Sequence, residues 1–265
     1  MMDFKGQIVW ITGASSGLGE ALAIALAHRG CRLILTARRT ELLNALKNKL
    51  PFPDRVGLLP FDLQQTAQLP ALVQNAWDVF GGLDTVFLNA GLGQWGTVQE
   101  TTRAVEEKIF AVNYHAPVAL TKALLPLFRQ QKHGHIVAIT SMAGRFGQSH
   151  LAAYSASKAA LEVYMESTRE EVYSSSIQVQ WVIPGNIQTH IMKTALTAQG
   201  QALNRDALAQ AKGMKPQVMA EKIIAFAQTN GRKKNIGGLE LLALPLHHCL
   251  PRLFYFLLRK RHGTH

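Results

Sequence analysis

Tyr154 and Lys158 are the two residues of this sequence whose types and spacing could most directly perform chemistry. They lie four positions apart in the segment AAYSASKAALEVY, residues 152–164, and on a helix such a pair would share one face. An ammonium beside a phenol favours the phenolate and lowers a pKa that is ordinarily about 10. The pair could therefore donate a proton near neutral pH. The same spacing also occurs in ordinary helices, so the assignment depends on what the rest of the chain supplies.

A glycine-rich turn lies far upstream, in the segment TGASSGLG at residues 12–19. It follows an apolar run and opens a helix-like segment, and its glycines allow the backbone to approach a ligand closely. A helix N-terminus offers unpaired N–H groups and a positive dipole end to an anion. The order of strand, glycines and helix predicts a dinucleotide pyrophosphate site, although the G-x-x-x-G-x-G spacing differs from the common G-x-G-x-x-G. The predicted contacts are Gly13, Ser15, Ser16, Gly17, Leu18 and Gly19.

The end of the second strand-like run predicts which dinucleotide binds. In a βαβ unit this position meets the adenosine ribose, where an acidic residue would bind the 2′-hydroxyl of NAD. This sequence instead has TARRTE, with Arg38 and Arg39 and no carboxylate before Glu41. Arginine makes charge-assisted hydrogen bonds to phosphate, so the sequence predicts that NADP(H) is preferred over NAD(H).

A regular framework must position these residues, and the chain is long enough to supply one. It has 265 residues, 48% of them apolar and 17% charged, which suits one large α/β domain. Short β-branched runs alternate with longer helix-period segments, which favours a doubly wound parallel sheet covered on both faces. The predicted strands are 7–12, 32–37, 56–61, 84–89, 135–140 and 177–183. The predicted helices are 18–29, 40–49, 66–80, 103–131, 153–174 and 216–229.

Composition argues against several functional classes. Two cysteines, Cys31 and Cys249, are too few for a disulfide framework and indicate a reducing, cytoplasmic setting. We expect neither a secretory signal nor a membrane-spanning stretch. The net charge of +11 could suit anionic lipid, a phosphorylated ligand or nucleic acid, but the basic residues are scattered and carry no nucleic-acid signature. We therefore expect no nucleic-acid partner, and no metal site at HHC, 247–249, because adjacent residues on a helix point apart.

The chain divides into a catalytic domain and a short extension. Residues 1–235 are predicted to form the nucleotide-binding domain, including a helical substrate flap at about 190–213. Residues 236–265 form an apolar and basic extension whose apolar side chains precede Arg259, Lys260 and Arg261. It could lie peripherally on a membrane surface, or pack on the domain or on another subunit, and the sequence leaves these alternatives open.

Several motifs stand together in one order, and the combination is more specific than any single one. They are TGASSGLG (12–19), LNAG (88–91), Asn113, Ser141, YSASK (154–158) and PGNIQT (184–189). This set resembles the classical short-chain dehydrogenase/reductase family over residues 7–230, including the interval of 13 residues between Ser141 and Tyr154. HAPVALTKALLP, GHIVAI and the basic, apolar ending resemble one branch of it, the dehydrogenase/reductase member 7 and 7B proteins. The resemblance implies a Rossmann-type domain with a mostly parallel, seven-stranded sheet.

The resemblance also implies roles for the catalytic candidates. Tyr154 would be the general acid in carbonyl reduction and the base in alcohol oxidation. Lys158 would hold the nicotinamide ribose and lower the pKa of Tyr154. Ser141 would hydrogen-bond the substrate oxygen, and Asn113 would help to hold a water that links Lys158 to solvent. Hydride would reach carbon from the cofactor while a proton reaches oxygen from the tyrosine.

Further cofactor contacts follow from the same resemblance. Asp62 would accept a hydrogen bond from the adenine amino group, and the small residues after the fourth strand would lie along the adenosine. The loop after the sixth strand would contact the nicotinamide, and Leu88 replaces an asparagine that the family often has. The remaining implied contacts are Leu63, Asn89, Ala90, Gly91, Pro184, Gly185, Ile187 and Thr189. The family also usually forms dimers through helices corresponding to 103–131 and 153–174, which implies a homodimer or homotetramer.

The substrate pocket should draw on loops beyond the carboxyl ends of the strands. The candidate lining residues suggest an apolar, lipid- or steroid-like ketone, aldehyde or alcohol. They are Gln94, Trp95, Phe146, His150, Asn186 and Met192. Arg145 could meet a substrate carboxylate. The favoured function is an NADP(H)-dependent carbonyl reductase; the alternatives are a sugar epimerase or dehydratase and a catalytically silent, NADP-sensing scaffold at a membrane surface.

Overall fold

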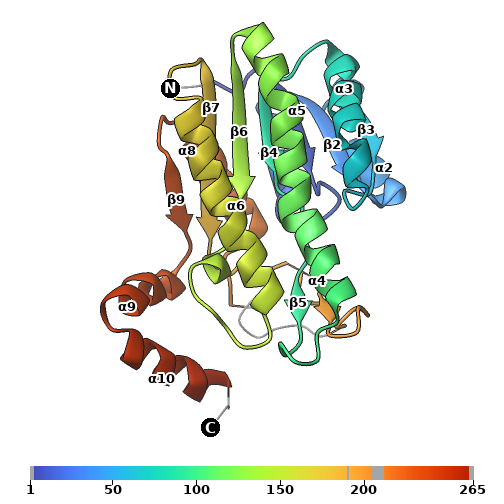
Figure 1. Ribbon diagram of the computed structural model, residues 1–265. Coiled ribbons are helices and arrows are strands. Elements are labelled where there is room, and N and C mark those ends of the chain that lie inside the picture. Colours follow the sequence, from blue (N-terminus) through green and yellow to red (C-terminus); the bar gives the residue numbers. More distant parts are fainter. Residues whose placement is uncertain (1–2, 190, 205–211, 263–265) are drawn as a thin grey trace.

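The computed structural model of the protein describes residues 3–189, 191–204 and 212–262 (Figure 1). Seven parallel strands form one sheet in the order β3-β2-β1-β4-β6-β7-β9. β2 and β3 lie on one side of β1, and β4, β6, β7 and β9 lie on the other side. The strand order therefore reverses between β1 and β4, which places a topological switch point at their carboxyl ends. The strands are β1 (Ile8–Thr12), β2 (Arg32–Ala37), β3 (Val56–Pro60), β4 (Thr85–Leu88), β6 (Gly134–Ile139), β7 (Ile177–Pro184) and β9 (Lys233–Ile236).

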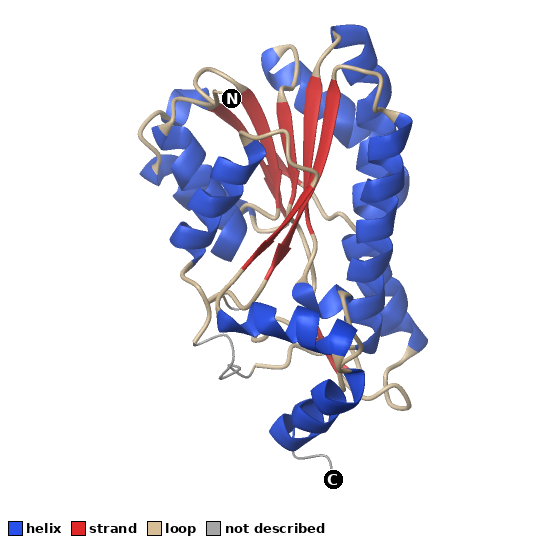
Figure 2. Ribbon diagram, turned by 90° about the vertical axis from the view of Figure 1, so that its left-hand side faces the viewer, coloured by secondary structure: helices blue, strands red, loops and turns tan. Residues whose placement is uncertain are grey.

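Helices cover both faces of the sheet, as Figure 2 shows. Successive strand residues point to opposite faces, so Val9 and Ile11 pack with α1, α2 and α8, whereas Trp10 packs with α3, α5 and α6. The apolar strand runs are therefore buried on both sides, which confirms the predicted doubly wound fold. The helices are α1 (Gly17–His28), α2 (Thr40–Lys49), α3 (Leu69–Phe80), α4 (Arg103–Phe110), α5 (Ala116–Gln131), α6 (Ala152–Glu171) and α8 (Pro216–Ala227).

The helix predicted over residues 103–131 is interrupted. A wider, π-helical turn over Ala111–His115 separates α4 from α5 and contains Asn113. Pro117 has no N–H to give to the Asn113 carbonyl, so the regular α-helical ladder cannot continue through this point. Such turns are frequent at functional sites.

Two other sequence-based expectations differ from the structure. The last strand, β9, reads KKNI and was absent from the predicted strands, because an edge strand with exposed polar side chains lacks the apolar pattern. The predicted helical character of the flap at 190–213 is wrong for its described residues, which form turns and a short strand, β8 (Leu196–Thr197). β8 pairs in parallel with β5 (Gln94–Trp95). Residue 190 and residues 205–211 of that flap lie outside the described residues.

The C-terminal extension forms three short helical segments. A single 3₁₀ turn, η5 (Leu239–Leu242), is followed by α9 (Ala243–Cys249) and α10 (Pro251–His262). In Figure 1 they project from the domain at the end toward which the strands run. Within the described residues, the structure has no helix of the length and apolar character needed to cross a bilayer.

Candidate active site

The glycine turn after β1 is packed so tightly that a larger residue could not replace key glycines. A Cβ added at Gly19 would lie 2.2 Å from the Gly13 carbonyl oxygen, and one added at Gly13 would lie 2.7 Å from the Ala90 Cα. Gly13 also has a φ of +69°, in the region that favours glycine. Gly17 faces Thr189 from the loop after β7, at 3.1 Å between the added Cβ and the threonine Cγ2. The turn thus forms a bare backbone cradle at the N-terminus of α1, which suits a pyrophosphate.

Asn89 fixes this cradle to the end of β4. Its side-chain Nδ2 donates to the carbonyls of Thr12 (2.9 Å) and Gly13 (3.3 Å), while its backbone nitrogen donates to the Thr12 hydroxyl at 3.0 Å. The backbone nitrogen of Ala90 donates to the same hydroxyl at 3.2 Å. The Asn89 side chain therefore shapes the cofactor cradle through its own hydrogen bonds, and its predicted contact with the adenosine stays a prediction.

The two arginines after β2 behave differently. The Arg39 Nη2 donates to the hydroxyls of Ser15 (3.1 Å) and Ser16 (2.9 Å), so it joins the end of β2 to the glycine turn. Arg38 is exposed, and its guanidinium forms no hydrogen bond or ion pair with the described residues. One of the two cations is thus held by the glycine turn and the other is open to solvent, and their contact with a ribose phosphate stays a prediction.

The predicted adenine contacts after β3 have other neighbours. The Asp62 carboxylate accepts hydrogen bonds from the backbone and side chain of Gln64, at 3.1–3.2 Å. The Leu63 side chain is buried in the core beneath α3, so only its backbone could face a ligand. The predicted cofactor contact of Leu63 would therefore be made by its backbone, and it stays a prediction.

Tyr154 and Lys158 lie on one face of α6, as the spacing predicts, and Ser141 meets them from the end of β6. The Ser141 hydroxyl accepts a hydrogen bond of 3.1 Å from the backbone nitrogen of Ala143 and lies close enough to the Tyr154 phenol to act on its pKa. Burial raises the pKa of the Tyr154 phenol, and the nearby Ser141 hydroxyl acts in the opposite direction. Desolvation of the phenolate is the larger of these two effects on the Tyr154 pKa, and the lowering of that pKa by Lys158 stays a prediction.

Lys158 is buried, one helical turn after Tyr154 in α6. Its Nζ donates to the carbonyl of Ile139, the last residue of β6, at 2.9 Å. Burial lowers the pKa of this ammonium to about 8. A Cβ added at Gly91 would lie 3.4 Å from both the Lys158 Nζ and the Asn113 Oδ1, so this glycine lets the loop after β4 lie directly against both.

Asn113 is fully buried in the π-helical turn and anchors the same loop. Its Oδ1 accepts from the backbone nitrogen of Leu92 at 2.8 Å, and its Nδ2 donates to the Leu92 carbonyl at 3.0 Å and to the Ser157 hydroxyl at 3.1 Å. The amide thus ties the loop after β4 to α6. The structure brings together the four catalytic candidates, whose roles stay predictions.

The loop after β7 is held by the C-terminal extension. The Glu240 Oε1 accepts a hydrogen bond of 3.0 Å from the backbone nitrogen of Asn186 and lies against Gly185. The backbone of Ile187 pairs with Met214. Sequence reasoning missed Glu240, whose only signal is that it is the last carboxylate of the chain.

Of the six predicted substrate residues, two are buried and four are partly exposed. Gln94 is 1% exposed, and its Oε1 accepts from the backbone nitrogen of Tyr154, so it supports α6 rather than lining a pocket. Phe146 is also buried, under Phe254 of α10. Trp95 and His150 stack at 4.8 Å between ring centroids, whereas Asn186 and Met192 are partly exposed. Gln94 is corrected from a substrate contact to a support of the catalytic helix.

Arg145 is likewise corrected. Its guanidinium forms an ion pair with the buried carboxylate of Glu162 on α6, so it is already partnered and does not await a substrate carboxylate.

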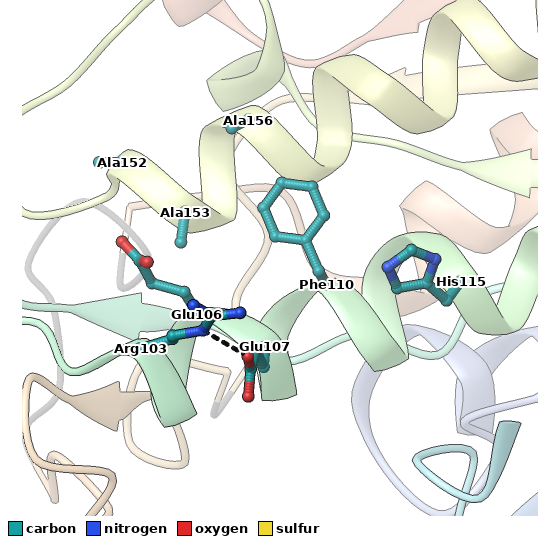
Figure 3. Close-up of a pocket in the computed structure, with 8 residues that line it drawn as sticks. All are labelled: Arg103, Glu106, Glu107, Phe110, His115, Ala152, Ala153 and Ala156. Carbon is teal, nitrogen blue, oxygen red and sulfur yellow. Dashed lines mark hydrogen bonds and ion pairs between the residues drawn. The ribbon is translucent and has the colours of Figure 1, made fainter.

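A hollow of about 760 Å³ lies beside the catalytic helix but does not include its catalytic side chains (Figure 3). It runs between α4 and the first turns of α6, with the Phe110 ring near its centre and the alanines of α6 along one side. Its lining residues are Arg103, Glu106, Glu107, Phe110, His115, Ala152, Ala153 and Ala156.

Comparison with known proteins gives consistent matches across the chain. The family model described as short chain dehydrogenase matches residues 7–200. A Drosophila melanogaster protein named dehydrogenase/reductase SDR family protein 7-like is 38% identical, covering 98% of this chain and 81% of that protein. The dehydrogenase/reductase SDR family member 7B of Bos taurus is 32% identical, covering 97% of this chain and 82% of its own.

Solved structures agree with the fold. The crystal structure of a short-chain dehydrogenase from Streptomyces avermitilis is 29% identical with a TM-score of 0.82, covering 98% of this chain and all of that one (100%). A metagenomic short-chain oxidoreductase, solved in complex with NADP, is 27% identical with a TM-score of 0.73, covering 89% of this chain and 97% of its own.

Proposed function

The chain belongs to the short-chain dehydrogenase/reductase family, and from that premise we propose that it reduces an apolar ketone or aldehyde with NADPH. One observation carries the proposal: Ser141 lies beside the Tyr154 phenol, with Lys158 buried on the same face of α6, at the carboxyl ends of the strands next to a glycine cradle. The arrangement joins a proton donor to a nucleotide site, which is what carbonyl reduction requires.

The residues of the cradle fit a dinucleotide. Gly13 and Gly17 have positive φ and no Cβ, so the backbone at the first turn of α1 can approach a pyrophosphate. Arg38 and Arg39 supply positive charge where a ribose 2′-phosphate would lie, which favours NADP(H) over NAD(H). The NADP complex of the metagenomic relative is in keeping with this choice. When bound, NADPH supplies hydride to the substrate carbon.

The side chains of this protein would handle the proton. Ser141 hydrogen-bonds the carbonyl oxygen, and the Tyr154 hydroxyl gives its proton to that oxygen as the C–H bond forms at carbon. Lys158 then stabilises the resulting phenolate, because its ammonium lies one helical turn further along the same face of α6. The raised pKa of Tyr154 keeps the phenol protonated before reaction. The proton count balances when Tyr154 is reprotonated from solvent past Lys158 and Asn113.

The substrate is proposed to be apolar because two aromatic rings stack near the start of the catalytic helix. Trp95 of β5 and His150, which precedes α6, stack at 4.8 Å between ring centroids. The direct test is NADPH consumption by the full chain against a panel of ketones and aldehydes, including long-chain lipids. Turnover of apolar members supports the proposal; a panel without turnover, or turnover only with NADH, overturns it.

We propose further that the protein works as a homodimer or homotetramer through the outer faces of α4, α5 and α6. Val163 on α6 is 63% exposed, and the hollow around Phe110 lies between α4 and α6. An exposed apolar side chain and a hollow with apolar and charged lining residues, on adjoining helices, would suit an isologous contact. Light scattering of Val163→Asp against the unaltered chain tests this; an unchanged mass would contradict it.

A further inference from the structure

Exposed apolar side chains are concentrated at the C-terminal end of the described chain. Of the twelve large apolar side chains exposed among the described residues, six lie between residues 239 and 257. They are Leu239, Leu242, Leu250, Leu253, Phe256 and Leu257. Single exposed apolar residues need no explanation, but a concentration within one short segment marks an interaction surface.

Helix α10 has two apolar faces, and only one is covered. Phe254 is 4% exposed and packs edge-on against Phe146, at 4.7 Å between ring centroids. Leu253, Phe256 and Leu257 are 45%, 62% and 46% exposed, and their i, i+3, i+4 spacing places them on one stripe. The covered face fixes the helix to the domain, so the uncovered stripe is held at the surface.

The charges around this stripe indicate what covers it. The sequence from residue 241 to residue 265 contains no aspartate or glutamate but has Arg252, Arg259, Lys260 and Arg261. Arg252, Arg259 and Lys260 are exposed. An apolar stripe flanked by cations suits the headgroup region of an anionic bilayer. A second copy fits less well, because a two-fold contact through this stripe would bring the same cations together in a chain of net charge +11.

We propose that the uncovered face of residues 239–260, the tail face, docks on the surface of an anionic phospholipid bilayer. The stripe enters the headgroup and acyl boundary without spanning it, and the cations contact lipid phosphates.

Docking by this face would also orient the active site, a consequence that rests on the proposed function. Phe254 of α10 covers Phe146, which follows Ser141 in the next loop, and Glu240 binds the backbone of Asn186 after β7. Figure 1 shows α9 and α10 at the end of the domain where the strands terminate. The site would thus face the bilayer, and an amphiphilic carbonyl compound would reach Tyr154 from the lipid.

Vesicle co-sedimentation of the full chain tests the docking. Wild type should bind phosphatidylcholine vesicles that contain phosphatidylserine, more weakly without it, and more weakly as salt rises. The triple variant Leu253→Gln, Phe256→Gln, Leu257→Gln should lose affinity by a factor on the order of 100. The matched control changes three exposed apolar residues elsewhere, Leu42→Gln, Val98→Gln and Val218→Gln, and should bind as wild type does.

Two further readouts separate docking from catalysis and from self-association. The tail-face variant should keep its thermal transition and its turnover of a water-soluble ketone, yet lose turnover of a ketone carried in vesicles. Absence of turnover in every variant would refute the proposed function and leave the binding result standing. The docking proposal would be overturned if wild type did not bind phosphatidylserine vesicles, or if the tail-face variant bound them equally well. If the variant changed only from dimer to monomer, the stripe would instead be a contact with a second copy.

Discussion

The side-chain oxygen of Gln94 accepts a hydrogen bond of 3.1 Å from the backbone nitrogen of Tyr154. This nitrogen lies in the first turn of α6, where N–H groups have no partner within the helix. The Gln94 amide nitrogen in turn donates to the Thr101 hydroxyl at 3.0 Å. Gln94 therefore acts as a positioning residue for the helix that carries the catalytic pair.

We expect Gln94→Ala to lower the free energy of unfolding by about 1–3 kcal/mol, because it leaves a buried N–H without a partner. It should also lower kcat more than it raises KM, since the helix that holds Tyr154 loses its support. Thr101→Val is the control: it removes the other partner of Gln94 and should reduce stability while leaving kcat near wild type. Denaturant unfolding and steady-state kinetics measure both, and equal losses of kcat in the two variants would contradict the positioning role.

Gly19→Ala should abolish nucleotide binding, because the added methyl would lie 2.2 Å from the Gly13 carbonyl oxygen. The turn would have to open, and the cradle would lose its shape. Gly147→Ala adds the same methyl where no atom lies within 4 Å and should bind NADPH as wild type does. Fluorescence titration with NADPH compares them, and retained affinity in Gly19→Ala would rule out the cradle.

The two arginines after β2 should have separable effects on cofactor choice. Arg38→Ala should weaken the binding of NADPH by about 10- to 100-fold, because a charge-assisted hydrogen bond is lost. It should weaken the binding of NADH far less. Arg39→Ala should weaken both, because Arg39 also holds the hydroxyls of Ser15 and Ser16. Titration with each nucleotide distinguishes the two roles; an equal loss of NADPH and NADH affinity in Arg38→Ala would exclude a 2′-phosphate contact.

Stability should fall in mild acid because of His135. Burial lowers the pKa of its imidazole to about 4 in the folded protein, below the ordinary 6.5. Between these values the unfolded chain binds the additional proton, so stability is complete above pH 6.5 and is lost as pH falls toward 4. The integrated effect is about 3 kcal/mol. The free energy of unfolding, measured in urea at a series of pH values, should fall less steeply with decreasing pH in His135→Gln than in wild type. Identical slopes in the two proteins would refute His135 as the cause of the loss of stability.

Much of the fold could be predicted because most strands of the sheet are buried, β-branched runs of sequence. The strand β9 could not be predicted, since its Lys233, Lys234 and Asn235 are exposed at the edge of the sheet. The break at Ala111–His115 had a readable signal in Pro117, but one proline is also tolerated near the start of a helix.

The candidate site was predictable where residue type alone restricts the chemistry. Tyr154, Lys158 and Ser141 meet as their spacing indicates. Gln94 was misassigned because an amide can face a ligand or cap a helix equally well, and only the packing of β5 against α6 decides between them. The role of Glu240 could not be predicted because its partner, Asn186, lies 54 residues away in the chain.

The most direct test of the central claim is Tyr154→Phe, which removes one hydroxyl and keeps the ring. The variant should keep the wild-type thermal transition and bind NADPH with similar affinity, because the cradle and Lys158 are untouched. Its turnover of any carbonyl compound that wild type reduces should fall by roughly 100- to 10,000-fold, since the proton donor is lost. Turnover equal to wild type, with NADPH bound, would contradict the assignment of Tyr154 as the acid.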